Sequence, residues 1–580
     1  MSGRAPRKSG EPWRQRLIRS LLYGRNVDRN AKARARVGFA MLAFAAVYAV
    51  IAGRLVMFAV GADSHSARRA ASQDAIATAR PDIVDRNGEI LATDVKAPSL
   101  FAEPRRIIDK DEAIELLTGA LPDLDSIETR DRLSTRKGFV WLRREISPKQ
   151  QQEIHKLGIP GIGFLRENKR VYPTGAEVAH LIGLVNIDNQ GIAGMEKWLD
   201  NNGLADLHRA GFATDRLQKP VELSIDLRVE HALRDELLKA KEKYKAQAAS
   251  GLVSNVRTGE IVALVSLPDF DPNNPKEAHD PDRINRLTTG VFEMGSTFKT
   301  LTLAMALDSG KANLNTLYDA RGALQYGKFA IHDTHPLGRS ITLSEVFTFS
   351  SNVGAARVAL SQGVEAHKAF LRKLGQLERL RTELPESASP IVPKRWSELN
   401  TITIAFGHGI AVAPLQAVMG INAMVNGGLL IPPTFLKRSE EEARAMAKRV
   451  VKPETSEKIR YLMRLNAEIG TAKQADVKGY YIGGKTGTSE KVVGGRYSKK
   501  QVLNSFTAIL PADNPQYQLL VMLDEPKALP ETHGYITSGW NAVPTGGKVI
   551  ARIAPLLGVE PRFDLPPSDR LILATSRTNQ

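Results

Sequence analysis

The chain has one long run of apolar residues, and it lies close to the N-terminus. Residues 37–53 carry no charge, and after Arg54 the apolar character continues to Gly61. A helix needs about 20 apolar residues to cross a bilayer, so Arg54 must lie near one interface, where its side chain can snorkel. We predict a single uncleaved transmembrane helix at residues 37–60. A signal peptide would have a shorter apolar core and an A-x-A-like site, and a buried core helix is the other alternative.

Short strand-like runs separated by turn signals follow this segment. Two of them flank Asn87-Gly88, a dipeptide typical of hairpin turns. Residues 221–244 predict a strand and then an amphipathic helix. Residues 251–267 predict a hairpin through Thr258-Gly259. A helix beside adjacent antiparallel strands indicates an α+β domain.

A chain of 580 residues is too long for one ordinary core, and the pattern divides it into five parts. They are a basic tail at 1–36, the anchor at 37–60, a first exported domain at 61–220, the α+β domain at 221–560 and a Pro-rich polar tail at 561–580.

The formal net charge of +17 is concentrated in the tail that precedes the anchor. Residues 1–36 hold eleven basic and two acidic side chains, and so contribute +9 of the total. Positive charge beside a span stays on the cytoplasmic side, which predicts export of everything after Gly61 and makes nucleic acid an unnecessary explanation. The absence of cysteine excludes disulfides and thiolate metal sites.

The first chemical signal is Ser296-Thr297-Phe298-Lys299, at the start of a helix-like stretch that ends at Gly310. Residues three apart share a helix face, so the Lys299 amine would reach the Ser296 hydroxyl. A serine needs a neighbour to take its proton, and a lysine can do so only if burial or a positive neighbour lowers its pKa. Alone, the tetrapeptide more often contains a capping serine and a surface lysine.

Two more short motifs follow in the same domain. Ser350-Ser351-Asn352 falls on a connection between two predicted helices, where Ser350 can pass a proton and Asn352 can both donate and accept hydrogen bonds. Lys485-Thr486-Gly487-Thr488 predicts the edge of a strand. Lys485 would attract an anionic substrate end and lower the pKa of Lys299 by repulsion, while Gly487 would let a substrate backbone approach closely.

Each motif is common, but the ordered set S-x-x-K, S-x-N and K-T-G resembles that of penicillin-binding proteins and class A β-lactamases. The chain is similar to class B penicillin-binding proteins over about residues 37–560, and most closely resembles the FtsI-like division type of Gram-negative bacteria. Other stretches that carry the resemblance are Arg80 with Asp85-Arg86-Asn87-Gly88, and residues 170–185, 191–200, 256–275, 407–416 and 504–511. Pro81 and Met294 depart from the family pattern, where glycine and proline are usual.

The resemblance implies an α+β protein with a single N-terminal transmembrane helix. An elongated, non-catalytic pedestal domain at 61–220 and a penicillin-binding or serine-β-lactamase-like transpeptidase domain at 221–560 would follow. That last domain would be an antiparallel sheet flanked by helices.

The resemblance also implies residue roles. The catalytic residues would be Ser296 as nucleophile, Lys299 as base, Ser350 and Asn352. The residues that bind the substrate carboxylate and line the groove would be Lys485, Thr486, Gly487 and Thr488, and the backbone N–H groups of Ser296 and Thr488 would form the oxyanion hole.

By the same resemblance, the chain would cross-link peptidoglycan stem peptides on glycan strands made from lipid-linked precursors, and β-lactams would acylate Ser296. It would need no cofactor, and would lie in the bacterial inner membrane with a periplasmic catalytic domain. We expect it at the division septum, with divisome partners that include an FtsW-type glycosyltransferase.

Several alternatives remain open. A β-lactamase is disfavoured because Trp396 stands where a class A general-base glutamate would be. An elongation-type transpeptidase and a non-catalytic β-lactam sensor or scaffold are the others. His332, Asp333 and His335 suggest a metal, but resemble a D-x-H-P loop of the family, and residues 494–500 predict a basic, mobile surface loop.

Overall fold

The computed structural model describes Trp13 and residues 29–60, 80–204 and 219–564, in two compact units, residues 1–76 and 77–580. In the first unit, α2 is a helix over Arg29–Val60. Its segment Val37–Arg54 is the one helical stretch among the described residues that is long and apolar enough to cross a membrane. Most of the predicted basic tail and residues 565–580 of the predicted C-terminal tail lie outside the described residues.

The second unit begins with a sheet whose strands run in the order β3-β2-β1-β7, with β4 also paired to β2. The strands are β1 (Ile83–Val84), β2 (Ile90–Ala102), β3 (Val140–Arg143), β4 (Ile162–Val171) and β7 (Val221–Glu222). β1 and β2 form the predicted hairpin. The Asp85 carboxylate accepts the Asn87 and Glu89 N–H groups at 2.7 and 2.9 Å, and Gly88 has a φ of +90°. Only glycine adopts that angle at low cost, so the turn sequence fixes the hairpin.

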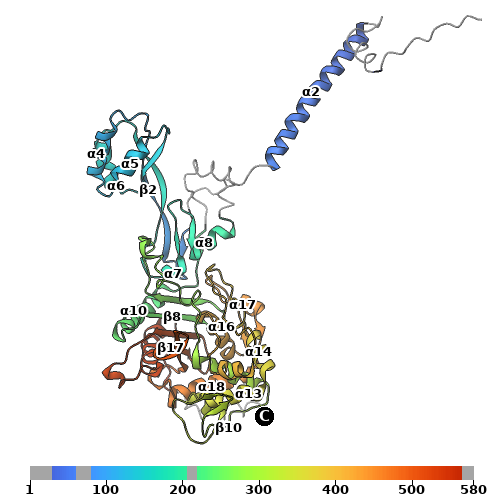
Figure 1. Ribbon diagram of the computed structural model, residues 1–580, viewed down its shortest axis with the longest axis vertical. Helices are drawn as coiled ribbons and strands as arrows, with labels where there is room; N and C mark the ends of the chain where they lie inside the picture. The colour runs from blue at the N-terminus through green and yellow to red at the C-terminus, as the bar shows by residue number, and fades with distance from the viewer. Residues whose placement is uncertain (1–12, 14–28, 61–79, 205–218, 565–580) are drawn as a thin grey trace, which may run out of the picture. The chain divides into compact units, whose positions relative to one another are not determined.

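Three helices gather around one end of β2 (Figure 1). They are α4 (Lys110–Ala120), α5 (Ser126–Leu133) and α6 (Pro148–Lys156). The Asp109, Asp125 and Ser147 side chains cap their N-termini by accepting backbone N–H groups. A small apolar core, which includes Leu100, Leu117 and Leu133, holds the helices on the strand.

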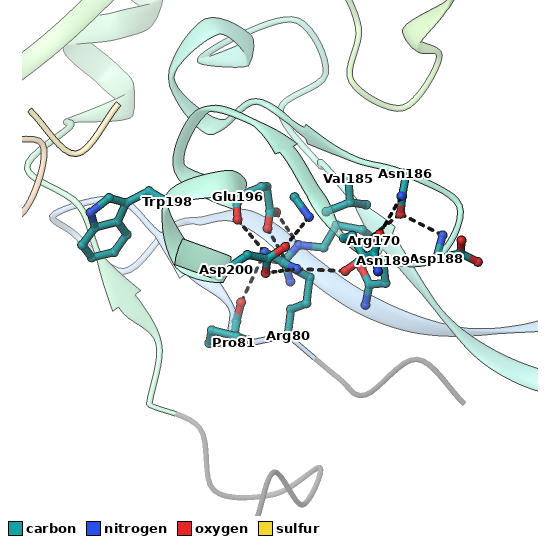
Figure 2. A network of polar contacts seen from close by, with 12 residues as sticks. Arg80, Pro81, Arg170, Val185, Asn186, Asp188, Asn189, Glu196, Trp198 and Asp200 are labelled. Carbon is teal, nitrogen blue, oxygen red and sulfur yellow. Dashed lines mark hydrogen bonds and ion pairs between the residues drawn. The ribbon is translucent and has the colours of Figure 1, made fainter. Parts of the chain in front are cut away.

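A buried ionic network ties the rest of this pedestal together. The Glu196 carboxylate receives hydrogen bonds from the Arg80 and Arg170 guanidinium groups, at 2.7 and 2.6 Å (Figure 2). Arg170 also pairs with Asp94 at 3.1 Å, and Arg80 with Asp200 at 2.7 Å. The side chains of Arg80, Arg170 and Glu196 are at most 1% exposed. Each of these three charges therefore relies on the others in place of water.

We predict that Glu196→Ala destabilises the pedestal by about 3–5 kcal/mol, because it leaves two buried guanidinium groups without their shared partner. Urea denaturation followed by circular dichroism measures this. The control is Glu128→Ala, which breaks the exposed pair with Arg132 and should cost only about 0.5 kcal/mol. Equal losses in the two variants would contradict the role of the network.

The α+β domain is joined to the pedestal by strand pairing and by hydrogen bonds. β7 lies parallel to β1, so the pedestal sheet takes its last strand from the segment that leads into the α+β domain. Asp85 also accepts the Leu227 N–H at 3.1 Å. The remaining pedestal elements are α7 (Ala179–Ile182), β5 (Leu184–Val185), β6 (Gly191–Ala193), α8 (Gly194–Leu199) and the π turn η1 (Asp200–Leu204).

A five-stranded antiparallel sheet forms the centre of the α+β domain, in the order β16-β17-β18-β8-β9. Its strands are β8 (Ala248–Asn255), β9 (Ile261–Leu267), β16 (Gly483–Val493), β17 (Arg496–Leu510) and β18 (Tyr517–Asp524). The predicted hairpin of β8 and β9 and the α+β class are confirmed. β16 has one free edge, as predicted for the K-T-G motif.

Helices cover both faces of this sheet. Val253 and Val521 pack with α10 (Leu227–Lys243) and α19 (Ala542–Leu556), whereas Leu252 and Leu520 belong to the core that contains the helices behind the other face. Successive side chains of a strand point to opposite faces, so both faces are apolar. The helices that pack with Leu252 and Leu520 on that other face include α11 (Lys299–Asp308), α12 (Leu343–Thr348), α13 (Asn352–Gln362), α16 (Pro414–Val425) and α18 (Pro453–Ile469).

Smaller elements complete the domain. The helices are α14 (Val364–Lys373), α15 (Glu398–Ile404) and α17 (Glu440–Met446). The paired strands are β10 (Leu317–Asp319) with β13 (Ser340–Thr342), β11 (Leu324–Tyr326) with β12 (Phe329–Ile331), and β14 (Leu429–Leu430) with β15 (Lys448–Arg449). Short 3₁₀ turns are η2 (Pro275–Glu277), η3 (Gly295–Phe298), η4 (Lys473–Ala475), η5 (Pro530–Thr532) and η6 (Ser538–Trp540).

The predicted loop at residues 494–500 is wrong. β16 and β17 continue as paired strands to Val493 and Arg496, and only Gly494 and Gly495 form the turn, with φ of +58° and +80°. Two successive positive φ angles suit a tight hairpin turn. The glycines that indicated a loop therefore close a regular hairpin, whose outer end, residues 491–500, we call the hairpin tip.

Candidate active site

Ser296 lies on the 3₁₀ turn η3, which we call the nucleophile turn, and Lys299 is the first residue of α11. The Lys299 Nζ lies 2.9 Å from the Ser296 Oγ. Ser296 is partly exposed, whereas Lys299 is completely buried. The three-residue spacing thus places an amine under a hydroxyl that a substrate can reach.

The second motif supplies the other partners of the Lys299 amine. Its Nζ lies 2.8 Å from the Asn352 Oδ1, 2.5 Å from the Ser350 carbonyl oxygen and 3.1 Å from the Ser350 Oγ. Ser350 has a φ of +58°, which is uncommon for a residue with a side chain and is found at functional sites. That conformation lets one residue present both its carbonyl and its hydroxyl to the same amine.

Lys485 approaches the same hydroxyl from β16. Its Nζ donates to the Ser350 Oγ at 2.9 Å and lies 5.6 Å from the centre of the Phe347 ring. Lys485 is completely buried. The Ser350 hydroxyl therefore lies between two amines, where it can pass a proton from one to the other.

Both lysines are shifted towards their neutral forms. Burial, and then repulsion from Lys485, hold the pKa of Lys299 well below its usual value, against a smaller opposing effect of Asp333. Burial lowers the pKa of Lys485 to about 7. A lowered pKa means that an amine loses its proton more readily, and a neutral amine can accept a proton from a serine.

Asp333 organises the second motif, and sequence reasoning gave it no role. Its carboxylate accepts the backbone N–H groups of Asn352 and Val353, at 2.5 and 2.9 Å, and the Ser351 hydroxyl at 2.6 Å. The Asp-x-His-Pro pattern was the available signal. No group of three potential metal ligands exists among the described residues, and Asp333 instead holds the start of α13.

The third motif lies on the free edge strand, directly against the nucleophile turn. A Cβ on Gly487 would come within 2.6 Å of the Met294 carbonyl oxygen and 2.3 Å of the Ser505 Oγ. The glycine is therefore needed for contact between protein segments, a different reason from the substrate approach that we predicted. The Thr486 and Thr471 hydroxyl groups share a hydrogen bond at 2.8 Å. The Thr488 hydroxyl oxygen accepts the Ser538 N–H at 3.1 Å.

Two more glycines bring a fourth segment to the nucleophile turn. A Cβ on Gly295 would lie 3.0 Å from the Thr488 carbonyl oxygen, and one on Gly407 would lie 2.1 Å from the Gly295 carbonyl oxygen. The turn is held between β16 and the loop at residue 407. All eight predicted site residues thus lie in segments that meet around the Ser296 hydroxyl. Such an arrangement can form and resolve an acyl ester on a serine, with a buried amine as the base.

Comparison with known proteins agrees with this geometry. The profile of the penicillin-binding protein transpeptidase domain matches residues 249–539, and that of the penicillin-binding protein dimerisation domain matches residues 75–202. A probable peptidoglycan D,D-transpeptidase FtsI of Caulobacter vibrioides is 38% identical over 84% of this chain and 83% of its own length. The peptidoglycan D,D-transpeptidase FtsI of Escherichia coli K12 is 30% identical over 84% of this chain and 85% of its own length.

The fold also matches a solved structure, penicillin-binding protein 3 from Mycobacterium tuberculosis in complex with aztreonam. It has a TM-score of 0.63 at 23% identity, and covers 84% of this chain and 98% of that one. The chain belongs to the class B penicillin-binding proteins, with their dimerisation and transpeptidase domains. It is a serine-type D,D-transpeptidase.

We predict a bell-shaped pH profile for acylation by benzylpenicillin. The rate rises with pH as Lys299 loses its proton, and falls near pH 7 as Lys485 loses the charge that attracts an anionic ligand. Lys485→Met removes the falling limb, and moves the rising limb to higher pH because Lys299 no longer faces a like charge. Stopped-flow acylation measures both limbs.

The control for this profile is Lys491→Met. Lys491 lies on the same strand, but its amine pairs with Asp524 and Glu525, so the profile should not change. A rising limb that stays in place in Lys485→Met would contradict the electrostatic coupling between the two buried lysines.

A second prediction concerns Asp333. Asp333→Ala removes the carboxylate that accepts three hydrogen bonds from Ser351, Asn352 and Val353. We therefore expect Ser350 and Asn352 to shift relative to Lys299. Misplacement of reacting groups by about 1 Å costs on the order of 100-fold in rate, and we expect acylation by benzylpenicillin to slow by about 10- to 100-fold. Asp319→Ala, which removes an exposed carboxylate paired with Arg321, should leave the rate unchanged.

Proposed function

We propose that this protein cross-links septal peptidoglycan, and that Ser296 is the nucleophile and Lys299 its base. The observation that carries the proposal is the 2.9 Å contact between the Ser296 hydroxyl and a completely buried lysine whose pKa is lowered by its surroundings. We assign the pedestal to residues 61–220 and the transpeptidase domain to residues 221–560.

The first half of the reaction forms an acyl-enzyme. The Ser296 Oγ attacks the penultimate D-Ala carbonyl of a stem peptide while its proton moves to the Lys299 amine. The C–N bond to the terminal D-Ala breaks, and this leaving group takes the proton from Lys299 directly or through Ser350. Free D-Ala departs and the stem remains as an ester on Ser296.

The second half reverses these roles. An amine of a neighbouring stem attacks the ester carbonyl and gives up a proton to the Lys299 amine, and the C–O bond to Ser296 breaks. The serine oxygen recovers a proton from Lys299. The product is an amide cross-link, and the enzyme returns to its starting state. A β-lactam follows the first half and then stays as an ester.

The substrate would lie along the free edge of β16. Lys485, Thr486 and Thr488 would hold its terminal carboxylate, and Gly487 lets the strand lie close to the nucleophile turn. The backbone N–H groups of Ser296 and Thr488 would form the oxyanion hole, where each donor contributes about 3–4 kcal/mol. Asn352 would keep the Lys299 amine in place.

Location follows from the anchor. We propose a single pass through the bacterial inner membrane at residues 37–60, with the basic tail in the cytoplasm and the catalytic domain in the periplasm. The similarity to the FtsI proteins of Caulobacter vibrioides and Escherichia coli supports a role in division. An FtsW-type glycosyltransferase would then be a partner.

Fluorescent penicillin labelling tests the chemistry. Wild-type full-length protein should carry one label that persists for many minutes, and Ser296→Ala should carry none, because the ester needs the Ser296 Oγ. Rapid multiple turnover of penicillin by the wild type would identify a β-lactamase instead. Labelling of Ser296→Ala would refute the assignment of the nucleophile.

Depletion in the source bacterium separates the biological roles. Loss of a division enzyme gives filaments without septa, whereas loss of an elongation enzyme gives rounded cells. Complementation with Ser296→Ala should fail. Septation supported by this variant would identify a scaffold, and rounded cells would contradict the septal assignment.

A further inference from the structure

The hairpin tip continues the edge strand that carries the third motif. β16 continues past Lys485 and Thr488 to Val493, and β17 returns from Arg496. Near the tip the side chains are exposed, for example Val492 at 58% and Val493 at 49%. An exposed two-stranded ribbon has little stability of its own, so its position depends on what holds it.

One side chain connects the outer part of the tip, residues 492–500, to the body of the domain. The Tyr497 hydroxyl donates to the Glu293 Oε1 at 3.1 Å, and the Tyr497 ring meets the His408 ring edge-on at 5.7 Å. Within the part of the chain that the structure describes, no other residue of 492–500 has a hydrogen bond, ion pair or ring contact outside the hairpin. Beyond the ion pairs that Lys491 makes with Asp524 and Glu525, Tyr497 therefore holds the outer part of the ribbon against the body of the domain.

Glu293 places that contact beside the reaction centre. It stands three residues before Ser296, and its Oε1 also accepts the Gly409 N–H at 2.8 Å. Its other oxygen, Oε2, is buried and has no hydrogen-bond partner among the described residues. Burial raises the pKa of Glu293 despite these two hydrogen bonds, so the side chain is held by its contacts and is not a solvated surface acid.

His408 fills the space between the tip and the nucleophile turn. The centres of the His408 and Phe406 rings are 5.4 Å apart. His408 directly follows Gly407, whose backbone packs against Gly295. Burial, and then repulsion from Lys299, lower the pKa of His408 to about 4. The imidazole is therefore neutral at neutral pH, and its ring lies against the rings of Phe406 and Tyr497. Tyr497 thus rests on Glu293, two residues before the nucleophile turn, and on His408 in the loop at residue 407.

We propose that Tyr497 and Glu293 form a latch that holds the hairpin tip beside the catalytic groove, and that the latched tip selects the part of the acyl donor preceding the attacked carbonyl. This rests on the proposed function, in which the donor carboxylate lies at Lys485 and Thr486. A donor aligned with the edge of β16 from that end must extend past Thr488 towards the tip. Tyr497 and Glu293 are positioning residues in this scheme.

The test compares two acylating agents that differ only beyond the reactive ring. Benzylpenicillin carries an acyl side chain that would reach towards the tip, and 6-aminopenicillanic acid carries none. We expect Tyr497→Phe to slow acylation of full-length protein by benzylpenicillin about five- to tenfold, the factor of roughly one lost hydrogen bond. Acylation by 6-aminopenicillanic acid should change less than about twofold, since that agent does not extend along the strand.

Variants of Glu293 test the same latch from its other side. Glu293→Ala should reproduce the selective loss, because the tyrosine hydroxyl then has no acceptor. Glu293→Gln should restore the wild-type ratio of the two rates, since an amide oxygen can accept both hydrogen bonds of Oε1. The matched control is Tyr326→Phe, which removes a 2.9 Å hydrogen bond to Glu398 elsewhere in the domain and should not alter the ratio.

An equal loss with both agents, or no loss with either, would overturn the latch. The latch would also be overturned if Glu293→Gln changed the ratio of the two acylation rates as much as Glu293→Ala does. The negative charge of Glu293 would then matter more than its hydrogen bond. Thermal melting shows whether each variant is folded. If Tyr497→Phe is not folded, the comparison of Glu293→Ala with Glu293→Gln is the test of the latch. Failure of both agents to acylate wild-type Ser296 would refute the proposed function itself, whereas acylation with an unchanged ratio in Tyr497→Phe refutes only the latch.

Discussion

The burial of two lysine amines around one serine hydroxyl is the constraint on which the site depends. The Ser350 Oγ contacts the Lys299 and Lys485 amines at 3.1 and 2.9 Å, and neither lysine is accessible to water. Two ammonium groups so close together and so poorly solvated repel each other strongly. Loss of a proton from one of them relieves that repulsion, and the neutral amine is then available as a base.

The rest of the catalytic domain keeps these segments together. The nucleophile turn, the edge strand and the loop at residue 407 approach so closely that a Cβ on Gly295, Gly407 or Gly487 would collide with a neighbouring segment. Asp333 fixes the segment that carries the second motif by accepting two backbone N–H groups and a hydroxyl. The sheet, apolar on both faces and covered by helices, provides the rigid support for this convergence.

The pedestal uses buried charge in the opposite way. Around Glu196 every buried guanidinium group meets a carboxylate, so the charges compensate and the network is structural. At the active site two buried lysines face each other, and burial together with their repulsion lowers the pKa of Lys299. The same physical cost of burial therefore holds one domain together and lowers the pKa of a lysine in the other.

The features that the amino-acid sequence predicts correctly are those with a local signal. The long apolar helix at Val37–Arg54 needs only composition, the hairpin at Asn87-Gly88 needs only a turn dipeptide, and the contact between Ser296 and Lys299 needs only helical spacing. The prediction failed at residues 494–500, because two glycines occur both in loops and in tight hairpin turns, and the strand pairing that distinguishes them involves residues on either side.

The identities of the chemical groups, their order and their local elements were determined by the amino-acid sequence alone. The tertiary structure decided which of them meet. Asp333 and Tyr497 are ordinary residues in sequence, and acquire roles only through contacts with residues that are 18 to more than 200 positions away. The lowered pKa of Lys299 is likewise a property of the fold, since desolvation and repulsion arise only when distant segments exclude water around the amine.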